Sequence, residues 1–228
     1  MSKKSMQFLF GDRELVITAK NLLETSADVI VNPTDSDLSH EFGLSAQIKQ
    51  QSGEQLIKES NLLLDQYTTI DCGMAVYTGA GLLPYEAVIH IVGPKMGEEN
   101  EQQKIEQVIA RCLQLCEINE WRSIAFPAIG AGGSGVPVGL VAQAFFRSIT
   151  HFWDARHECV IEKIEICLTD KKLMSFFEAF REDSLDQSEG ENVELQEEVD
   201  DEENIGIVDL SENDIADADS DEINDWFK

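Results

Sequence analysis

The sequence predicts an α/β fold in which a largely parallel or mixed sheet is covered by helices on both faces. Two observations predict it. Apolar runs of strand length alternate along the chain with segments of helical periodicity, and these runs contain few polar residues, as in strands buried on both faces. The chain has 228 residues, 43% of them hydrophobic, which is enough for one domain with a sizeable core and a further segment.

Two short runs of β-type residues begin the chain. Residues 6–10 (MQFLF) and 14–19 (ELVITA) are separated by Gly11-Asp12, a dipeptide typical of hairpin turns. The next run, ADVIVN at residues 27–32, is mainly apolar and ends in a polar residue. It predicts a buried strand.

Two helices and two strands are predicted for the middle of the chain. Residues 43–53 (GLSAQIKQQSG) and 53–66 (GEQLIKESNLLLDQ) have apolar residues at helical spacing. Residues 75–81 (AVYTGAG) predict a short strand. Residues 87–94 (AVIHIVGP) predict a second buried strand, which Gly-Pro ends.

The last third of the globular part repeats the alternation of helix and strand. Residues 103–119 have the clearest helical period, with apolar residues three, four and seven positions apart. Residues 123–130 (SIAFPAIG) and 161–170 (IEKIEICLTD) predict buried strands. Between them, residues 138–152 predict a helix with one apolar face, and residues 171–182 predict a closing helix.

Acidic residues are concentrated at the C-terminal end. The net charge is −27, of which −19 lies between Glu182 and Lys228 and −8 in the rest of the chain. This balance argues against a nucleic-acid partner. Residues 183–203 contain too few apolar residues to offset the entropy of ordering. We therefore expect a globular domain over residues 1–182 and an acidic, disordered tail over residues 183–228.

Two apolar islands interrupt the acidic tail. They are IGIVDL at residues 205–210 and INDWFK at residues 223–228. Such islands resemble short docking motifs, here for a basic protein partner. The alternative is a tail that only increases solubility, and the sequence leaves both open.

The cysteines and histidines suggest neither a disulfide framework nor a metal site. The five cysteines are an odd number with dispersed spacing, and we see no signal peptide. No apolar run reaches the ~18 residues of a membrane helix. We therefore expect a cytoplasmic protein without a membrane partner, a metal or a cofactor. Cys112 and Cys116 are expected in the core, as is His90, whereas His40 lies where it can reach a ligand.

Small residues follow two of the predicted buried strands, where helices begin. They are FGLSA (residues 42–46) and GAGGSGVP (residues 130–137). Ligands of open α/β sheets bind outside the carboxyl ends of the strands, and helix N-termini bind anions. Neither loop contains Lys or Arg, so we expect a diphosphate bound by main-chain N–H groups and helix dipoles alone. The alternative is that the glycines only permit tight strand-to-helix turns.

Three stretches of the chain resemble the macro domain family. ADVIVNPTDSDLSHEFGLSAQI resembles the family's DAIVNAAN and the Gly-rich loop after it, AVIHIVGP resembles YVIHAVGP, and SIAFPAIGAGGSGVP resembles SIAFPAIGTGIFGYP. The resemblance covers roughly residues 15–181. It implies a three-layer α/β/α fold with a central mixed sheet. It also implies binding of ADP-ribose, free or on a protein, or of a related nucleotide diphosphate; some members hydrolyse ADP-ribose adducts.

The resemblance also implies roles for individual residues. Asn21, with its neighbour Leu22, stands where the family reads adenine, and Thr169 stands where an aromatic residue often stacks on adenine. Asn32 and Asp35 match two asparagines of the family motif and would face the distal ribose. The two diphosphate loops correspond to Gly43, Leu44, Ser45, Ala46, Gly130, Ala131, Gly132, Gly133, Ser134, Gly135 and Val136.

Five of these residues depart from the family pattern. Asn21 stands where the family usually has an Asp that reads the adenine amino group, and Val136 stands where an aromatic residue often precedes the Pro. Ser45 stands where the best-known hydrolases carry an Asp that positions and helps activate water, and a Ser hydroxyl without a partner is a poor base. Thr169 would lose a stacking interaction of about 0.5–1.5 kcal/mol. Asp35 would bring a negative charge towards a diphosphate.

The leading hypothesis is therefore a binding module for ADP-ribose or a related nucleotide diphosphate, weaker than regular family members and without the usual hydrolase residues. Two alternatives stay open. One is an atypical ADP-ribosyl hydrolase that uses Asp35 as its catalytic residue. The other is a degenerate scaffold whose acidic tail docks on a basic protein partner.

Overall fold

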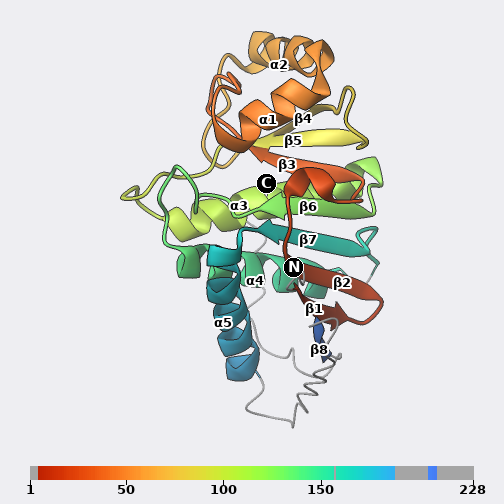
Figure 1. The fold of residues 1–228 in the computed structure, drawn as a ribbon, viewed down its shortest axis with the longest axis vertical. Coiled ribbons are helices and arrows are strands. Elements are labelled where there is room, and N and C mark those ends of the chain that lie inside the picture. Colours follow the sequence, from red (N-terminus) through yellow and green to blue (C-terminus); the bar gives the residue numbers. More distant parts are fainter. Residues whose placement is uncertain (1–4, 157, 188–204, 210–228) are drawn as a thin grey trace.

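The structure is a computed structural model that describes residues 5–156, 158–187 and 205–209. Within these residues the chain forms an eight-stranded sheet of strand order β4-β5-β3-β6-β7-β2-β1-β8 (Figure 1). The strands are β1 (Ser5–Phe10), β2 (Arg13–Ala19), β3 (Val29–Pro33), β4 (Ala75–Gly79), β5 (Ala87–Ile91), β6 (Ser123–Pro127), β7 (Lys163–Leu168) and β8 (Ile205–Asp209).

The sheet is mixed, as the sequence predicts. Its centre is parallel and consists of the neighbouring strands β5, β3, β6, β7 and β2. On either side of this centre, β4 is antiparallel to β5 and β1 is antiparallel to β2. The predicted hairpin of β1 and β2 is confirmed. Its turn contains Gly11 at φ +61°, a left-handed conformation that glycine adopts without strain.

Helices cover both faces of the sheet (Figure 1). They are the 3₁₀ helix η1 (Leu22–Glu24) and the α-helices α1 (Gly43–Ser52), α2 (Glu54–Tyr67), α3 (Glu101–Asn119), α4 (Val138–Asp154) and α5 (Asp170–Gln187). All five α-helices coincide with predicted helices, to within a few residues at each end. The short η1 is not predicted.

Side-chain alternation along the strands produces two large hydrophobic cores, beside a small third cluster of Leu38, Ile70 and Val76. In β3, Val29 and Val31 belong to a core shared with α3, α4 and α5, while Ile30 belongs to a core shared with η1, α1 and α2. Successive side chains of a strand point to opposite faces, so one strand contributes to both cores. The larger core contains the predicted core residues Cys112 and Cys116. The three-layer α/β/α prediction is thus confirmed.

The C-terminal part has two features beyond the predicted elements. Helix α5 continues to Gln187, five residues past the predicted domain end at residue 182. Residues 205–209 of the first apolar island form β8, which pairs in parallel with β1. An unpaired β1 would expose a row of main-chain donors and acceptors, and β8 covers that edge. The second island, residues 223–228, and the rest of the predicted disordered segment lie outside the described residues.

In the described part of the chain, no helix is both long and apolar enough to cross a membrane.

Candidate functional site

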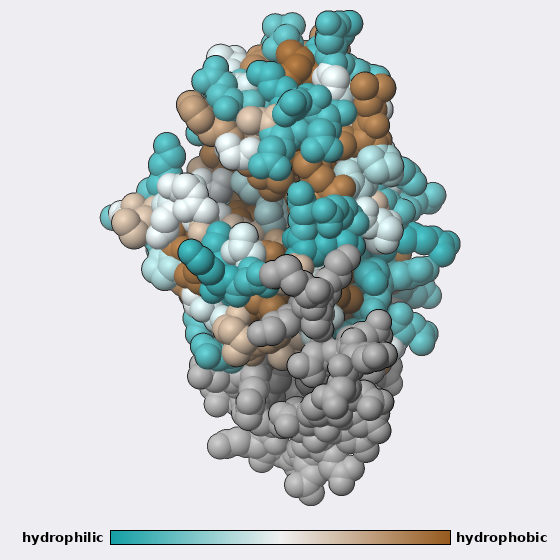
Figure 2. Space-filling view, in the orientation of Figure 1, coloured by the Kyte–Doolittle hydropathy of each residue, from teal (hydrophilic) through white to brown (hydrophobic). Residues whose placement is uncertain are grey.

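A cleft of about 1250 Å³ opens at the carboxyl ends of the parallel strands. Its lining includes the residues at or directly after the ends of β2, β3, β5, β6 and β7, namely Ala19, Lys20, Pro33, Thr34, Val92, Pro127, Ala128, Leu168 and Thr169. Hydrophobic residues are visible among hydrophilic ones in the middle of the face shown in Figure 2. The position of the cleft matches the rule that ligands of α/β sheets bind beyond the carboxyl ends of the strands.

The N-terminus of α1 forms one wall of the cleft. Its N-cap residue is Phe42, whose side chain makes no capping hydrogen bond. The first main-chain bond of the helix runs from the N–H of Ala46 to the carbonyl of Phe42, at 3.2 Å. Within the described residues, the N–H groups of Gly43, Leu44 and Ser45 therefore have no acceptor, and all three residues line the cleft.

The loop between β6 and α4 forms the facing wall. Gly130 and Gly135 adopt φ of +78° and +76°, and turn bonds join the N–H of Gly135 to the carbonyl of Gly132 and the N–H of Val136 to the carbonyl of Gly130. The N–H groups between them, on Gly132, Gly133 and Ser134, have no acceptor among the described residues, and these three residues line the cleft.

The second set of free N–H groups thus comes from the loop and not from a helix N-terminus. Helix α4 begins at Val138, which does not line the cleft. The expected dipole of α4 is therefore not part of this wall. A Cβ atom added at Gly132 or Gly133 would meet no atom within 4 Å, so these glycines leave the approach to the main chain open.

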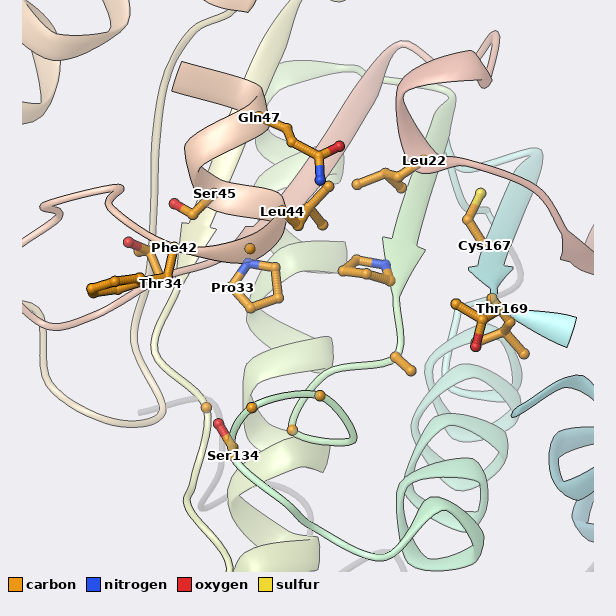
Figure 3. Close-up of a pocket in the computed structure, with 18 of the residues that line it drawn as sticks. Leu22, Pro33, Thr34, Phe42, Leu44, Ser45, Gln47, Ser134, Cys167 and Thr169 are labelled. Carbon is orange, nitrogen blue, oxygen red and sulfur yellow. The ribbon is translucent and has the colours of Figure 1, made fainter. Parts of the chain in front are cut away.

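Opposite ends of the cleft carry different side chains (Figure 3). Leu22, Cys167 and Thr169 lie at one end, and Thr34, Phe42 and Ser45 lie at the other. The N-cap of η1 is Asn21, whose side-chain oxygen accepts the N–H of Leu23 at 3.1 Å.

Behind the Ser45 end, a buried amide links three polar side chains. The Nδ2 of Asn32 lies 3.1 Å from Ser45 Oγ, 3.1 Å from His90 Nδ1 and 3.3 Å from His40 Nδ1. His90 Nε2 lies 2.9 Å from Thr78 Oγ1. The predicted core histidine is confirmed, because His90 is fully buried and both of its ring nitrogens have partners. The Oδ1 of Asn32 is buried and has no partner among the described residues.

His40 connects this network to helix α2. Its Nδ1 lies 2.8 Å from Ser45 Oγ, and its Nε2 lies 3.0 Å from Ser60 Oγ. His40 has φ +51° and is 2% exposed, yet it belongs to the cleft lining. A left-handed backbone at a non-glycine residue costs free energy, and such strain is often kept at functional sites.

Burial keeps both histidines neutral. Desolvation, with smaller contributions from Lys49 and, in the opposite sense, Asp37, lowers the pKa of His40 from 6.5 to about 4. Desolvation and the neighbouring His40 lower the pKa of His90 to about 3. A buried imidazolium would lose its hydration, so the neutral ring is favoured.

Most of the predicted site residues line this single cleft. Those that do are Asn21, Leu22, Asp35, Gly43, Leu44, Ser45, Gly130, Gly132, Gly133, Ser134 and Thr169. The structure does not bring Asn32, Ala46, Ala131, Gly135 and Val136 to the lining. Asn32 is fully buried behind Ser45, since it is the penultimate residue of β3, a strand inside the sheet, and Val136 is packed in the larger core.

Several lining residues are absent from the sequence-based set. Phe42 is 75% exposed at the rim, and Cys167 lies at the Thr169 end. Three lysines, Lys20, Lys95 and Lys172, also line the cleft. Lysine ammonium groups therefore lie in the same cleft as the N–H groups, and that of Lys20 is ion-paired with Glu165 at 3.3 Å. They lie outside both loops, and only the fold brings them to the cleft.

No group of three or more His, Cys, Asp or Glu side chains arranged to hold a metal ion occurs among residues 5–156, 158–187 and 205–209.

Comparison with known proteins places the chain in a family. The family model described as Macro domain matches residues 31–145. The chain belongs to the Macro domain family. A Macro domain-containing protein of Listeria monocytogenes is 32% identical over 163 residues, which are 70% of this chain and 93% of that protein. An O-acetyl-ADP-ribose deacetylase of Salmonella typhimurium is 36% identical over 140 residues, 60% of this chain and 78% of that protein.

Solved macrodomain structures share the fold of this chain. The Oceanobacillus iheyensis macrodomain with ADP has a TM-score of 0.77 at 20% identity and covers 82% of this chain and 100% of its own. A glycine-to-valine mutant of that macrodomain with ADPR has a TM-score of 0.74 at 21% identity, over 80% of this chain and 100% of its own.

The neutral histidines make stability depend on pH. Because the unfolded chain binds protons near pH 6.5 and folded His40 only near pH 4, the free energy of unfolding is highest above pH 6.5 and falls as the pH drops towards 4. Each such histidine contributes a slope of roughly 1.4 kcal/mol per pH unit in this window. Burial raises the pKa of Asp154 to about 6, so this carboxyl group increases the free energy of unfolding as the pH falls, opposite to the histidines.

The histidine contribution is therefore isolated by comparing two chains. Urea denaturation of the wild type and of His40→Gln between pH 7 and pH 5 should give a shallower fall of unfolding free energy in the variant, by roughly 1 kcal/mol per pH unit. Equal slopes would show that His40 is not held neutral by the fold.

Proposed function

We propose that the chain binds ADP-ribose, free or attached to a protein, in the cleft at the carboxyl ends of the strands. One observation carries the proposal. Two sets of acceptor-free N–H groups, on Gly43–Ser45 and on residues 132–134, line facing walls of one cleft. Unpaired main-chain donors at a helix N-terminus and in a glycine loop form a site for a diphosphate. The named ligands of the related macrodomain structures, ADP and ADPR, contain that group.

The two ends of the cleft suit the two ends of such a ligand. Asn21, Leu22 and Thr169 offer hydrogen-bonding and apolar atoms for adenine at one end. Thr34, Asp35 and Ser45 offer oxygen atoms for the hydroxyl groups of the distal ribose at the other. A cleft of about 1250 Å³ exceeds the usual volume of a small-molecule site, which leaves room for a ligand attached to a protein side chain.

Charges of both signs line the cleft, so the acidic balance of the whole protein does not extend to it. Lys20, Lys95 and Lys172 lie along the cleft, and burial lowers the pKa of Lys172. The negative charge of a bound diphosphate would offset the cost of desolvating the ammonium group of Lys172. Three exposed carboxylates, Asp35, Glu41 and Asp170, also line the cleft and oppose these charges, and solvent screens their repulsion. Lys20 is ion-paired with Glu165 at 3.3 Å.

A side chain placed between the two walls tests the proposal. Gly133→Val adds atoms where the structure has open space and requires no left-handed backbone, so the fold should remain intact. We expect ADP-ribose affinity, measured by calorimetry, to fall at least tenfold, which is about 1.4 kcal/mol. Gly139→Val in α4, also open to solvent, is the matched control and should bind as the wild type does. Unchanged binding by Gly133→Val would contradict the proposed position of the diphosphate.

The acidic tail contributes no described residue to the cleft. All lining residues lie between residues 19 and 172, so a chain ending at Gln187 should keep its affinity for ADP-ribose within about twofold. Such a chain keeps α5 whole and removes β8. A loss of binding beyond tenfold in calorimetry would assign the tail a role in the site. Binding of a basic protein by the tail stays a separate prediction, which the same truncation tests in a pull-down.

A further inference from the structure

Binding of a nucleotide diphosphate leaves one arrangement unexplained. A serine hydroxyl and a neutral imidazole lie 2.8 Å apart at the edge of the cleft, and both residues belong to its lining. The imidazole of His40 is held on its far side by Ser60, 3.0 Å away. A nucleophile, a base in hydrogen-bond reach and a third group that orients the base are the parts of a covalent hydrolytic site.

We propose that Ser45 is a nucleophile activated by His40, and that the pair hydrolyses carboxylic esters formed on a hydroxyl group of the distal ribose of ADP-ribose. This inference rests on the proposed function, because the cleft must first hold the nucleotide. It differs from the alternative that uses Asp35, and it gives Ser45 the partner that the sequence alone does not reveal.

The distances of the network admit an arrangement of protons that suits nucleophilic attack. Two further groups lie near His40 Nδ1, namely Asn32 Nδ2 at 3.3 Å and Thr34 Oγ1 at 3.4 Å. Asn32 Nδ2 can only donate, so Ser45 Oγ and His90 Nδ1 accept from it at 3.1 Å each. His90 must then carry its proton on Nε2 and donate it to Thr78 Oγ1. In this arrangement Ser45 accepts from Asn32 and donates its own proton to Nδ1 of His40. His40 in turn carries a proton on Nε2 and donates it to Ser60.

This order leaves the Ser45 proton directed at the base, which is the arrangement that nucleophilic attack requires. The other groups facing His40 are Lys49 of α1 and Asp37 of the loop before it, together with His90 of β5. Burial and Lys49 favour the neutral ring, whose pKa is lowered to about 4, so the base is unprotonated at neutral pH. No carboxylate is hydrogen-bonded to His40 among the described residues, so we expect slow turnover.

Ser45 lies where an ester on the distal ribose would be placed. In Figure 3 it lies on the same side of the cleft as Thr34 and Phe42, away from Leu22 and Thr169. The acceptor-free N–H groups of Gly43, Leu44 and Ser45 are adjacent in the chain to the hydroxyl. Because the proposed diphosphate accepts from these same donors, we assign no separate oxyanion hole, which is a second reason to expect slow turnover.

The reaction balances with water as the only co-reactant. Ser45 Oγ bonds to the acyl carbon as its proton moves to His40 Nδ1, and the carbon–oxygen bond to the ribose then breaks. The ribose oxygen takes the proton from His40 and leaves as a hydroxyl group. Water then adds to the acyl carbon, giving a proton to His40, and Ser45 leaves with that proton restored. The products are a carboxylic acid and ADP-ribose.

The test measures acetate release from O-acetyl-ADP-ribose together with ADP-ribose affinity. We expect slow wild-type turnover and a loss of kcat of at least 100-fold in Ser45→Ala and in His40→Gln. ADP-ribose affinity should fall by less than tenfold in Ser45→Ala, which loses one hydroxyl contact to the distal ribose, so weaker binding does not explain the loss of kcat. Ser148→Ala, a buried serine on α4 distant in the fold, is the matched control. Acid quenching during turnover should leave an acetyl group on Ser45, detectable by peptide mass spectrometry.

A peptide that carries ADP-ribose esterified to a glutamate is assayed as a second substrate. Ser45-dependent turnover of either ester supports the proposal, and the ester that reacts identifies the acyl group. Ser60→Ala should lower kcat without changing KM, since it only positions His40. The kcat profile should be flat between pH 5 and 8, without an inflection near 6.5.

The outcomes separate the two proposals. A wild-type chain that binds ADP-ribose but releases no acetate above the buffer rate overturns the Ser45–His40 pair and leaves the binding function intact. A Ser45→Ala variant that turns over at the wild-type rate overturns the pair as well. A wild-type chain that fails to bind ADP-ribose overturns the proposed function itself, and the pair with it.

Discussion

Main-chain N–H groups without acceptors are the feature on which the rest of this site depends. Buried or cleft-facing donors of this kind are costly unless something accepts from them. At Gly43–Ser45 and at residues 132–134 the fold aligns such donors on facing walls of one cleft. Water satisfies them in the free protein, and an anion with several oxygens satisfies them better because its charge strengthens each bond.

The sheet and the buried polar network hold those donors in place. Parallel β3 and β6 are neighbours, so the loops after them must emerge side by side at the same edge. Behind the first loop, Asn32 fixes Ser45, and His40 ties that residue to α2 through Ser60. The histidines of this network are neutral because burial lowers the pKa of both, so the network adds no charge beside the place where we propose a diphosphate binds.

The sequence predicts the architecture well because most of it follows from local patterns. Continuous apolar runs identify β3, β5, β6 and β7, and helical spacing identifies every α-helix of the described residues. What it misses depends on long-range packing. β8 is a short apolar island in an acidic segment, and only its pairing with β1 makes it a strand. Residue types at the site are predicted better than their positions. Asn32 is the polar end of a predicted strand and is expected to face the distal ribose, yet the register of β3 buries it behind Ser45.

The partner of Ser45 illustrates the same limit. Its spacing from His40 in the sequence gives no sign of a hydrogen bond, which forms because the chain turns through left-handed residues, His40 and Gly43, before α1. The lysines of the cleft come from three separate segments, and no pattern in the chain links them.

The most direct test of the account is a titration of ¹⁵N-labelled protein with ADP-ribose, followed by the amide resonances of the two loops. We expect the largest shifts at Gly43, Leu44, Ser45, Gly132, Gly133 and Ser134, whose N–H groups change from water to a charged acceptor. Saturable binding that leaves these amide resonances unshifted, or no binding at millimolar ADP-ribose, would contradict the claim that these N–H donors form the site.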